Sequence, residues 1–258
     1  MKKRFMSAGM AAVVAMASLT ACGGSASTET TAADAKAETS AEAGESSAEA
    51  GIAEGGTLKI GVIGPLTGAA ASYGIAVQNG AGLAVKEINE AGGINGAQIE
   101  FQFQDDEHDA EKSVNAYNTL KDWGMQMLMG TVTSAPCVAV ADKTMADNMF
   151  QITPSGSSVE CAQNPNVFRV CFSDPDQGAA SATYIAENKL ADKIAVIYDS
   201  SDVYSSGIYE RFASEAANHG LDIVAAEAFT ADSNKDFSTQ LQKAKDADAD
   251  LVFLPIYY

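Results

Sequence analysis

Hydroxyl groups are concentrated in loops that directly follow short apolar runs of this sequence. These loops lie at residues 64–73, 131–134 and 155–158. Hydroxyls and free backbone N–H groups at a helix start suit an anionic group such as a carboxylate, because the unpaired donors and the helix dipole point the same way. Serine also caps helices, which is the alternative role for each serine taken alone. The loops therefore predict an anion site only if the fold brings them together.

The elements around these loops follow the pattern of the α/β class. After Gly56, short apolar runs alternate with amphipathic stretches, which is typical of a doubly wound parallel sheet. The expected strands lie at residues 57–63, 99–103, 125–129, 150–153 and 167–172. Ligands bind beyond the carboxyl ends of such strands, where loops lead into helices. All three hydroxyl-bearing loops occupy that position.

Side-chain spacing places two helices between these strands. Val77, Ala81, Ala84 and Ile88 recur at spacings of four and three, and predict a helix with one apolar face. Asp109 is predicted to cap the start of the next helix, because its carboxylate can accept from the free N–H groups there.

The alternation restarts after Asp174, with expected strands at residues 194–198, 221–226 and 251–254. We therefore divide the chain into an N-terminal lobe, 57–173, and a partial C-terminal lobe, 174–258. The sequence stops at the exit of the last expected strand, so we expect a complete two-lobed protein to need roughly another hundred residues. The chain is then expected to be a fragment of a longer gene product or a poorly stable protein, because apolar edges would lack cover.

The N-terminus has the pattern of an export signal. A short basic segment precedes an apolar run at residues 5–19, which is too short to span a bilayer comfortably. The run ends in Leu19-Thr20-Ala21-Cys22, which resembles the lipobox of bacterial lipoproteins. We expect residues 1–21 to be a lipoprotein signal peptide and Cys22 to be lipidated, anchoring the protein to the outer face of the cell membrane. A buried first helix with an incidental cysteine is the alternative.

A change in composition separates this signal from the alternating pattern. Residues 22–56 are rich in Ala, Gly, Ser, Thr and Glu and contain almost no large apolar side chains. Such a segment buries too little apolar surface to offset the entropy of ordering its backbone, so we predict a disordered tether. A helix is the alternative, but no apolar stripe would hold it in place.

Charge and cysteine spacing exclude several kinds of site. The formal net charge is −18 and no basic stripe follows the signal, so we expect no nucleic-acid partner. Cys137, Cys161 and Cys171 lack CxxC or Cys/His spacing, so we expect no zinc site and no cofactor. In an exported protein Cys161 and Cys171 could form a disulfide or remain buried thiols, and the sequence leaves both open.

An enzyme of the same layered architecture is the rival class. The sequence has no GxGxxG after its first strand, no Walker A motif and no GxSxG. His108 and His219 lack catalytic or metal-ligand spacing and are predicted to be solvated loop or helix-end residues. The run Asp105-Asp106-Glu107 is predicted to be a solvated loop with helix capping rather than a metal site. We therefore do not expect an enzyme.

Several short motifs occur in order along the chain. They are Gly64-Pro65-Leu66-Thr67-Gly68, Ser72-Tyr73-Gly74, Gly92-Gly93-Ile94-Asn95-Gly96, Thr153-Pro154-Ser155 and Asp202-Val203-Tyr204-Ser205. Together they resemble the leucine/isoleucine/valine-binding protein family, the type I periplasmic binding proteins of branched-chain amino acid ABC transporters. The resemblance runs from about Thr57 to the end, and it is the ordered set that is specific.

The resemblance implies a role for particular residues. Ser134 would bind the carboxylate of an amino acid through its hydroxyl and backbone N–H, Ser155 would offer its main chain, and Ser157 its hydroxyl. Tyr73 from the first lobe and Tyr204 from the second would each form a wall of the pocket. The acidic partner of the ligand ammonium in this family lies beyond the last strand, so the resemblance places it outside this sequence.

The resemblance also implies binding without chemistry. The ligand would stabilise a closed arrangement of the lobes by touching both, and the permease subunits of an ABC importer would recognise that form. We expect a monomer that binds branched-chain or related amino acids. The alternatives are a sensor ectodomain of the same fold and a non-functional fragment.

Overall fold

The computed structural model describes residues 55–258, which contain two separate parallel sheets. The predicted signal peptide, the lipidation site at Cys22 and nearly all of the predicted tether lie outside the described residues. Both sheets belong to one compact unit. Within residues 55–258, no helix is both long enough and apolar enough to cross a membrane.

The first sheet has five parallel strands in the order β2-β1-β3-β4-β5. Their bounds are β1 (Thr57–Gly64), β2 (Gln98–Asp105), β3 (Met127–Met129), β4 (Gln151–Thr153) and β5 (Val167–Arg169). The side chains of Leu58, Val62 and Ile63 on β1, which lies between β2 and β3, are buried. The predicted strands and their parallel pairing are confirmed, although β3 and β5 are shorter than their apolar runs.

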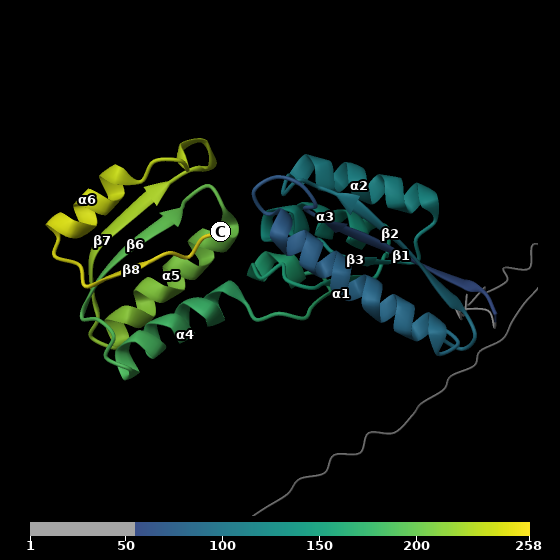
Figure 1. The fold of residues 1–258 in the computed structure, drawn as a ribbon, viewed down its shortest axis with the longest axis horizontal. Helices are drawn as coiled ribbons and strands as arrows, with labels where there is room; N and C mark the ends of the chain where they lie inside the picture. The colour runs from purple at the N-terminus through teal and green to yellow at the C-terminus, as the bar shows by residue number, and fades with distance from the viewer. Residues whose placement is uncertain (1–54) are drawn as a thin grey trace, which may run out of the picture. The chain divides into compact units, whose positions relative to one another are not determined.

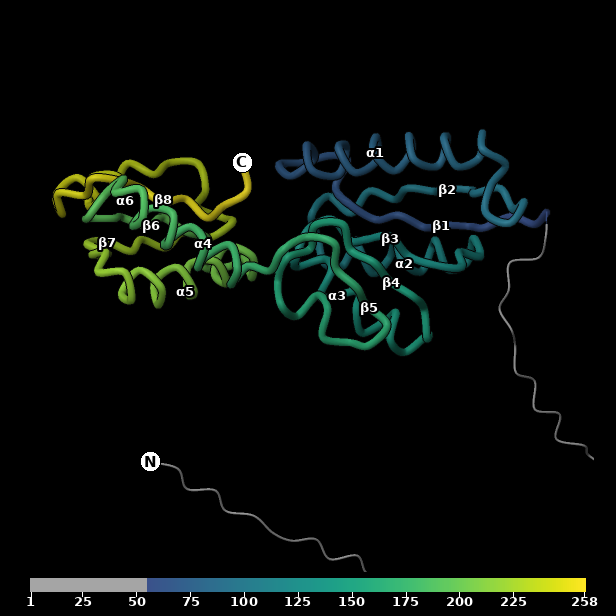
Figure 2. Tube along the Cα trace, turned by 90° about the horizontal axis from the view of Figure 1, so that it is seen from below, coloured from purple at the N-terminus to yellow at the C-terminus, as the bar shows by residue number. Residues whose placement is uncertain are grey.

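Helices cover both faces of this sheet. They are α1 (Ala71–Glu90), α2 (Ala110–Trp123) and α3 (Ser134–Ala146). Figure 2 shows α1 along one face and α2 with α3 along the other. Leu120, Leu128 and Val140 are fully buried in the core that α2 and α3 form with the sheet. The predicted cap at Asp109 is confirmed, because its carboxylate accepts a hydrogen bond from the Lys112 N–H at 2.8 Å.

The apolar face predicted for α1 is only partly covered by the described residues. Val77 and Ala81 are half-buried, whereas Ala84 and Ile88 are exposed. The first turn of α1 packs most closely, because a Cβ on Gly74 would overlap the Pro65 carbonyl oxygen. This close approach holds the start of the helix against the loop that follows β1.

The second sheet has three parallel strands in the order β7-β6-β8. Its elements are α4 (Asp174–Glu187), β6 (Lys193–Asp199), α5 (Val203–Asn218), β7 (Asp222–Phe229), α6 (Ser238–Asp246) and β8 (Leu251–Phe253). Figure 1 shows α4 and α5 on one side of this sheet and α6 on the other. Ile194, Val196 and Phe212 are fully buried in the core that the sheet forms with α4 and α5. Two 3₁₀ turns, η1 (Val159–Ala162) and η2 (Ala231–Ser233), lie in the connections.

Candidate functional site

The loop after β1 is held by a side chain at the end of β2. The Asp105 carboxylate accepts hydrogen bonds from the Leu66 N–H at 2.8 Å and from the Thr67 hydroxyl at 2.7 Å. Burial alone would raise the pKa of Asp105, but the hydrogen bonds from Thr67, Leu66 and Glu107 lower it below the ordinary value. The acidic run that we predicted to be a solvated loop therefore has a structural role, and it fixes the loop that leads to Tyr73.

The predicted solvation of that run is wrong for Asp106, which is fully buried. One of its carboxylate oxygens accepts from the His108 N–H at 3.0 Å, and the other has no hydrogen-bond partner in the described structure. Burial raises the pKa of Asp106 to about 6. Within residues 55–258, no cluster of His, Cys, Asp or Glu side chains is arranged to hold a metal ion.

Buried hydroxyls join the loops after β3 and β4. The Thr153 hydroxyl donates to the Thr131 carbonyl oxygen at 2.6 Å and accepts from the Gly156 N–H at 2.8 Å. The Ser155 hydroxyl donates to the Val132 carbonyl oxygen at 2.6 Å. The two loops thus form one hydrogen-bonded platform at the carboxyl edge of the sheet, as the parallel arrangement predicted.

Ser134 occupies the centre of this platform. Its hydroxyl oxygen accepts hydrogen bonds from the Ser157 N–H at 3.1 Å and the Ser158 N–H at 3.2 Å. A hydroxyl has two acceptor lone pairs and one proton, so the Ser134 hydroxyl can also donate to a third group, and the Tyr257 hydroxyl is within its reach. Ser134 is also the first residue of α3, where no side chain caps the helix and Pro136 has no N–H. The start of α3 therefore offers donors suited to an anion.

Aromatic rings from elements next to both sheets lie close to this platform. Tyr257, which follows β8, stacks on Tyr204 of α5 with ring centroids 4.4 Å apart, and its ring edge faces Tyr73 of α1 at 5.3 Å. The Tyr257 hydroxyl accepts a hydrogen bond from the Ser134 N–H at 3.4 Å. Burial raises the pKa of Tyr257, so its hydroxyl is neutral at physiological pH. His108, predicted to be solvated, packs against the same ring at 5.1 Å and is half-buried.

A cavity of about 250 Å³ lies beside these rings. Its lining includes four of the five residues predicted to contact a ligand, namely Tyr73, Ser155, Ser157 and Tyr204. Gln177, Val132, Cys171, Phe172 and Tyr257 complete the lining. Ser134 does not line the cavity, because the Tyr257 hydroxyl occupies its N–H. On its other side Tyr257 borders a second cavity of about 240 Å³, with His108 and Asp202 in its wall.

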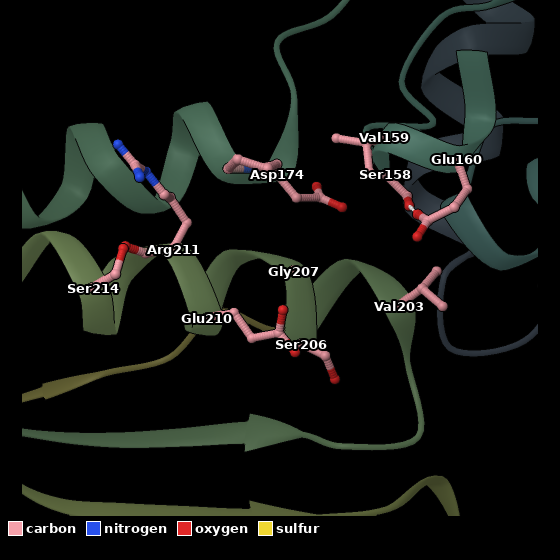
Figure 3. A pocket seen from close by; sticks show the side chains of 11 residues that line it. Ser158, Val159, Glu160, Asp174, Val203, Ser206, Gly207, Glu210, Arg211 and Ser214 are labelled. Carbon is pink, nitrogen blue, oxygen red and sulfur yellow. Dashed lines mark hydrogen bonds between the residues drawn. The ribbon is translucent and has the colours of Figure 1, made fainter. Parts of the chain in front are cut away.

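Asp174, at the start of α4, is a candidate that sequence reasoning missed. The residue is 1% exposed, and neither carboxylate oxygen has a hydrogen-bond partner among the described residues. Its N–H donates to the Ser157 carbonyl oxygen at 3.0 Å, which places it directly behind the predicted site. Burial raises the pKa of Asp174 to about 6, and the nearby Ser157 hydroxyl opposes that rise. Figure 3 shows its carboxylate directed toward η1, in a cavity of about 480 Å³ between η1, α4 and α5.

The sequence around Asp174 explains why it was missed. Ser173 and Asp176 form a capping box at the start of α4, so this acidic stretch resembles ordinary helix capping. The capping box is complete without Asp174. An acidic residue that capping does not require is the sequence signal that could have identified Asp174. Tyr257 could have been found by asking which residues leave a strand at the ligand edge of the second sheet.

Comparison with known proteins identifies similar sequences. A family model described as periplasmic binding protein matches residues 57–256. Leu/Ile/Val-binding protein homolog 3 of Brucella melitensis is 34% identical over 78% of this chain and 55% of the relative. The leucine-, isoleucine-, valine-, threonine- and alanine-binding protein of Pseudomonas aeruginosa is 31% identical over 78% of this chain and 54% of its own. The chain thus spans about half the length of the curated relatives it matches.

Solved structures are similar over the same region. The branched-chain amino acid transporter substrate-binding protein LivJ of Streptococcus pneumoniae, in complex with isoleucine, matches with a TM-score of 0.72 and 31% identity, over 77% of this chain and 56% of that chain. The leucine-binding protein LivK of Thermotoga maritima matches with a TM-score of 0.69 and 27% identity, over 77% of this chain and 56% of that chain. Both have the α/β fold with parallel sheets described above.

Proposed function

The chain belongs to the periplasmic binding protein family, and from this premise we propose that it is the amino-acid-binding component of an ABC importer. The observation that carries the proposal is the Ser134 hydroxyl, which accepts from two backbone N–H groups and can donate its proton to a ligand. A relative that binds leucine, isoleucine and valine and a similar structure that holds isoleucine support an amino acid as the solute.

We place the ligand carboxylate at the start of α3. The Ser134 hydroxyl and backbone N–H donate to it there, and the helix dipole favours its negative charge. Because the Tyr257 hydroxyl accepts from the Ser134 N–H, a carboxylate that binds this N–H displaces the hydroxyl. The Ser155 main chain and the Ser157 hydroxyl border the same cavity and orient the α-carbon end of the ligand.

We assign the ligand ammonium to the end of the cavity lined by Gln177, which lies one turn along α4 from Asp174. Asp174 does not line this cavity, and its carboxylate is directed toward η1 in the neighbouring cavity. Its negative charge therefore favours the ammonium through space and does not pair with it directly.

The aromatic rings supply the walls and link the two lobes. Tyr73 belongs to the first lobe and Tyr204 to the second, so a ligand between them contacts both. Such a ligand stabilises the closed arrangement by its differential affinity for it, and no bond is made or broken. The permease subunits of the importer then recognise the closed monomer.

The membrane attachment is part of the same proposal. Residues 1–21 direct export, Cys22 receives the lipid, and residues 22–56 tether the binding unit to the outer face of the membrane. A mass measurement of the mature N-terminus tests this assignment, because cleavage before a diacylglycerol-modified Cys22 gives a mass that no other processing gives.

The function is tested by thermal-shift screening of the mature protein against the twenty amino acids and related small acids, since a ligand that binds only the folded state raises the melting temperature. We expect a clear shift with leucine, isoleucine or valine. Shifts only with other amino acids or aromatic acids would change the solute and keep the mechanism. The absence of any shift would contradict the proposal and favour a sensor ectodomain or a non-functional fragment.

A further inference from the structure

Two buried thiols lie directly beneath the loops that carry Ser134 and Ser157. Cys137 is in the second turn of α3, Cys161 is in η1, and both side chains are fully buried. The Cys161 thiol donates to the Ser134 carbonyl oxygen at 3.6 Å. Gly156, in the loop between Ser155 and Ser157, is so close to Cys137 that a Cβ there would lie 3.2 Å from its sulfur. The first turns of α3, this loop and η1 therefore enclose both sulfurs.

The surroundings give the two thiols different character. Hydrogen bonding to the Cys161 thiol lowers the pKa of Cys137, and the charge of Arg169 acts in the same direction. The Gln151 side-chain amide also donates to the Cys137 sulfur, at 3.5 Å. The same contact with Cys137 raises the pKa of Cys161, and burial adds to that rise. In the folded chain the Cys161 thiol therefore keeps its proton.

We propose that Cys137 and Cys161 become joined by a disulfide when the chain folds in contact with a disulfide oxidant. The thiolate of either cysteine attacks one sulfur of the oxidant and releases the other as a thiolate, which leaves a mixed disulfide on that cysteine. The deprotonated sulfur of the second cysteine then attacks the sulfur of the first and displaces the remaining oxidant thiolate. The pair loses two protons and two electrons, and the oxidant disulfide is reduced to two thiols.

Burial sets when this exchange takes place. Because neither side chain is exposed in the folded chain, the oxidant reaches one of the two thiols before α3 and η1 have packed together. The pair is then brought into contact by the same packing that forms the serine platform. Cys171 is only half-buried and outside this enclosure, so it is expected to remain a free thiol. The product is a covalent tie between α3 and η1, independent of the identity of the solute.

The test is to refold the full 258-residue chain from denaturant in a mixture of reduced and oxidised glutathione, block free thiols by alkylation, and map disulfides by mass spectrometry. The expected result is a Cys137–Cys161 linked peptide, a mass lower by about 2 Da, and free Cys171. Reduction of the purified product is expected to lower its melting temperature by on the order of 5–10 °C.

The Cys171→Ser variant is the matched control and is expected to form the same linked peptide, whereas Cys137→Ser and Cys161→Ser are expected to form none. If refolding gives little soluble protein, the same map is made on the chain secreted into an oxidising compartment. Alkylation of every cysteine in oxidised, folded protein, or a bridge that uses Cys171 or Cys22, would overturn the proposal. A failed amino-acid screen would not affect this result, so the two proposals fail separately.

Discussion

The hydroxyl oxygen of Ser134 accepts a hydrogen bond from the backbone N–H of Ser157 at 3.1 Å, across 23 positions of the sequence. One side chain therefore connects the start of α3 with the loop after β4. The two loops cannot shift independently without leaving a buried N–H unsatisfied. Any ligand group bound by Ser134 is consequently positioned relative to Ser157 as well.

This relationship predicts the effect of Ser134→Ala. The substitution removes one hydroxyl donor for the carboxylate and leaves the N–H groups of Ser157 and Ser158 without their acceptor. We expect affinity for the amino acid to fall about 10- to 100-fold and the free energy of unfolding to fall by about 1–3 kcal/mol. Isothermal titration calorimetry and urea unfolding measure the two effects.

Ser155→Ala is the matched control for that variant. The Ser155 hydroxyl donates to the Val132 carbonyl oxygen, and only its main chain is assigned to the ligand. Ser155→Ala is therefore expected to change stability by about 1 kcal/mol and affinity by less than about threefold. Equal losses of affinity in both variants would contradict the assignment of the carboxylate to Ser134.

The raised pKa of the Asp174 carboxyl predicts that ligand binding depends on pH. Burial raises this pKa to about 6 and the Ser157 hydroxyl opposes that rise, while the charges of Asp202 and Glu160 raise the pKa and Arg169 lowers it. A bound ammonium stabilises the carboxylate, so ligand binding lowers this pKa and releases a proton at acidic pH. We expect the dissociation constant to rise about tenfold between pH 7 and pH 5. Calorimetry across that range measures the change.

The Asp174→Asn variant separates this effect from others. It is expected to bind weakly at pH 7 and to lose the tenfold dependence, because no carboxylate remains to titrate. A variant that keeps the pH dependence of the wild type would show that another group is responsible.

The raised pKa of the Asp106 carboxyl predicts a different pH effect, on the free energy of unfolding measured without a ligand. Its folded pKa is about 6 against an ordinary value of 3.8, so the folded state binds its proton more tightly than the unfolded state. Stability is therefore lost as pH rises from about 4 through 6, by on the order of 2–3 kcal/mol for this group. We expect Asp106→Asn, which keeps an acceptor for the His108 N–H, to be more stable than wild type at pH 7 and equal to it at pH 4. Urea unfolding at both pH values tests this sign.

Tyr257→Phe predicts a gain of affinity. The substitution keeps the ring that stacks on Tyr204 and removes the hydroxyl that occupies the Ser134 N–H. A ligand carboxylate then meets no competitor, and we expect affinity to rise about 2- to 10-fold, the equivalent of one ordinary hydrogen bond. Tyr258→Phe is the control, because the Tyr258 side chain is 88% exposed. Weaker binding by Tyr257→Phe would assign its hydroxyl to the ligand instead.

Local sequence patterns were sufficient for the order of the elements. Apolar runs gave the strands, and Asp109 marked the start of α2 because an N-cap is a local device. The predicted strand at residues 167–172 was too long, since β5 ends at Arg169, whose side chain turns to the carbonyl oxygens of Ser157 and Ser158. That contact is between distant residues and has no local signature.

Only part of the candidate site could be predicted from local sequence patterns. The loops with Ser155 and Ser157 could be placed at one edge of the first sheet because parallel strands bring their following loops together. Tyr73 and Tyr204 were assigned from the family resemblance, and both line the same cavity as these serines. The burial of Asp174, and the position of Tyr257 over Ser134, depend on packing between elements of different sheets, which no window of sequence contains. His108 was wrongly predicted to be solvated for the same reason, because the ring that covers it lies far along the chain.

Tyr257 lines both the cavity of about 250 Å³ and the cavity of about 240 Å³. The two spaces therefore share one side chain, and a substitution that shortens it enlarges both of them at once.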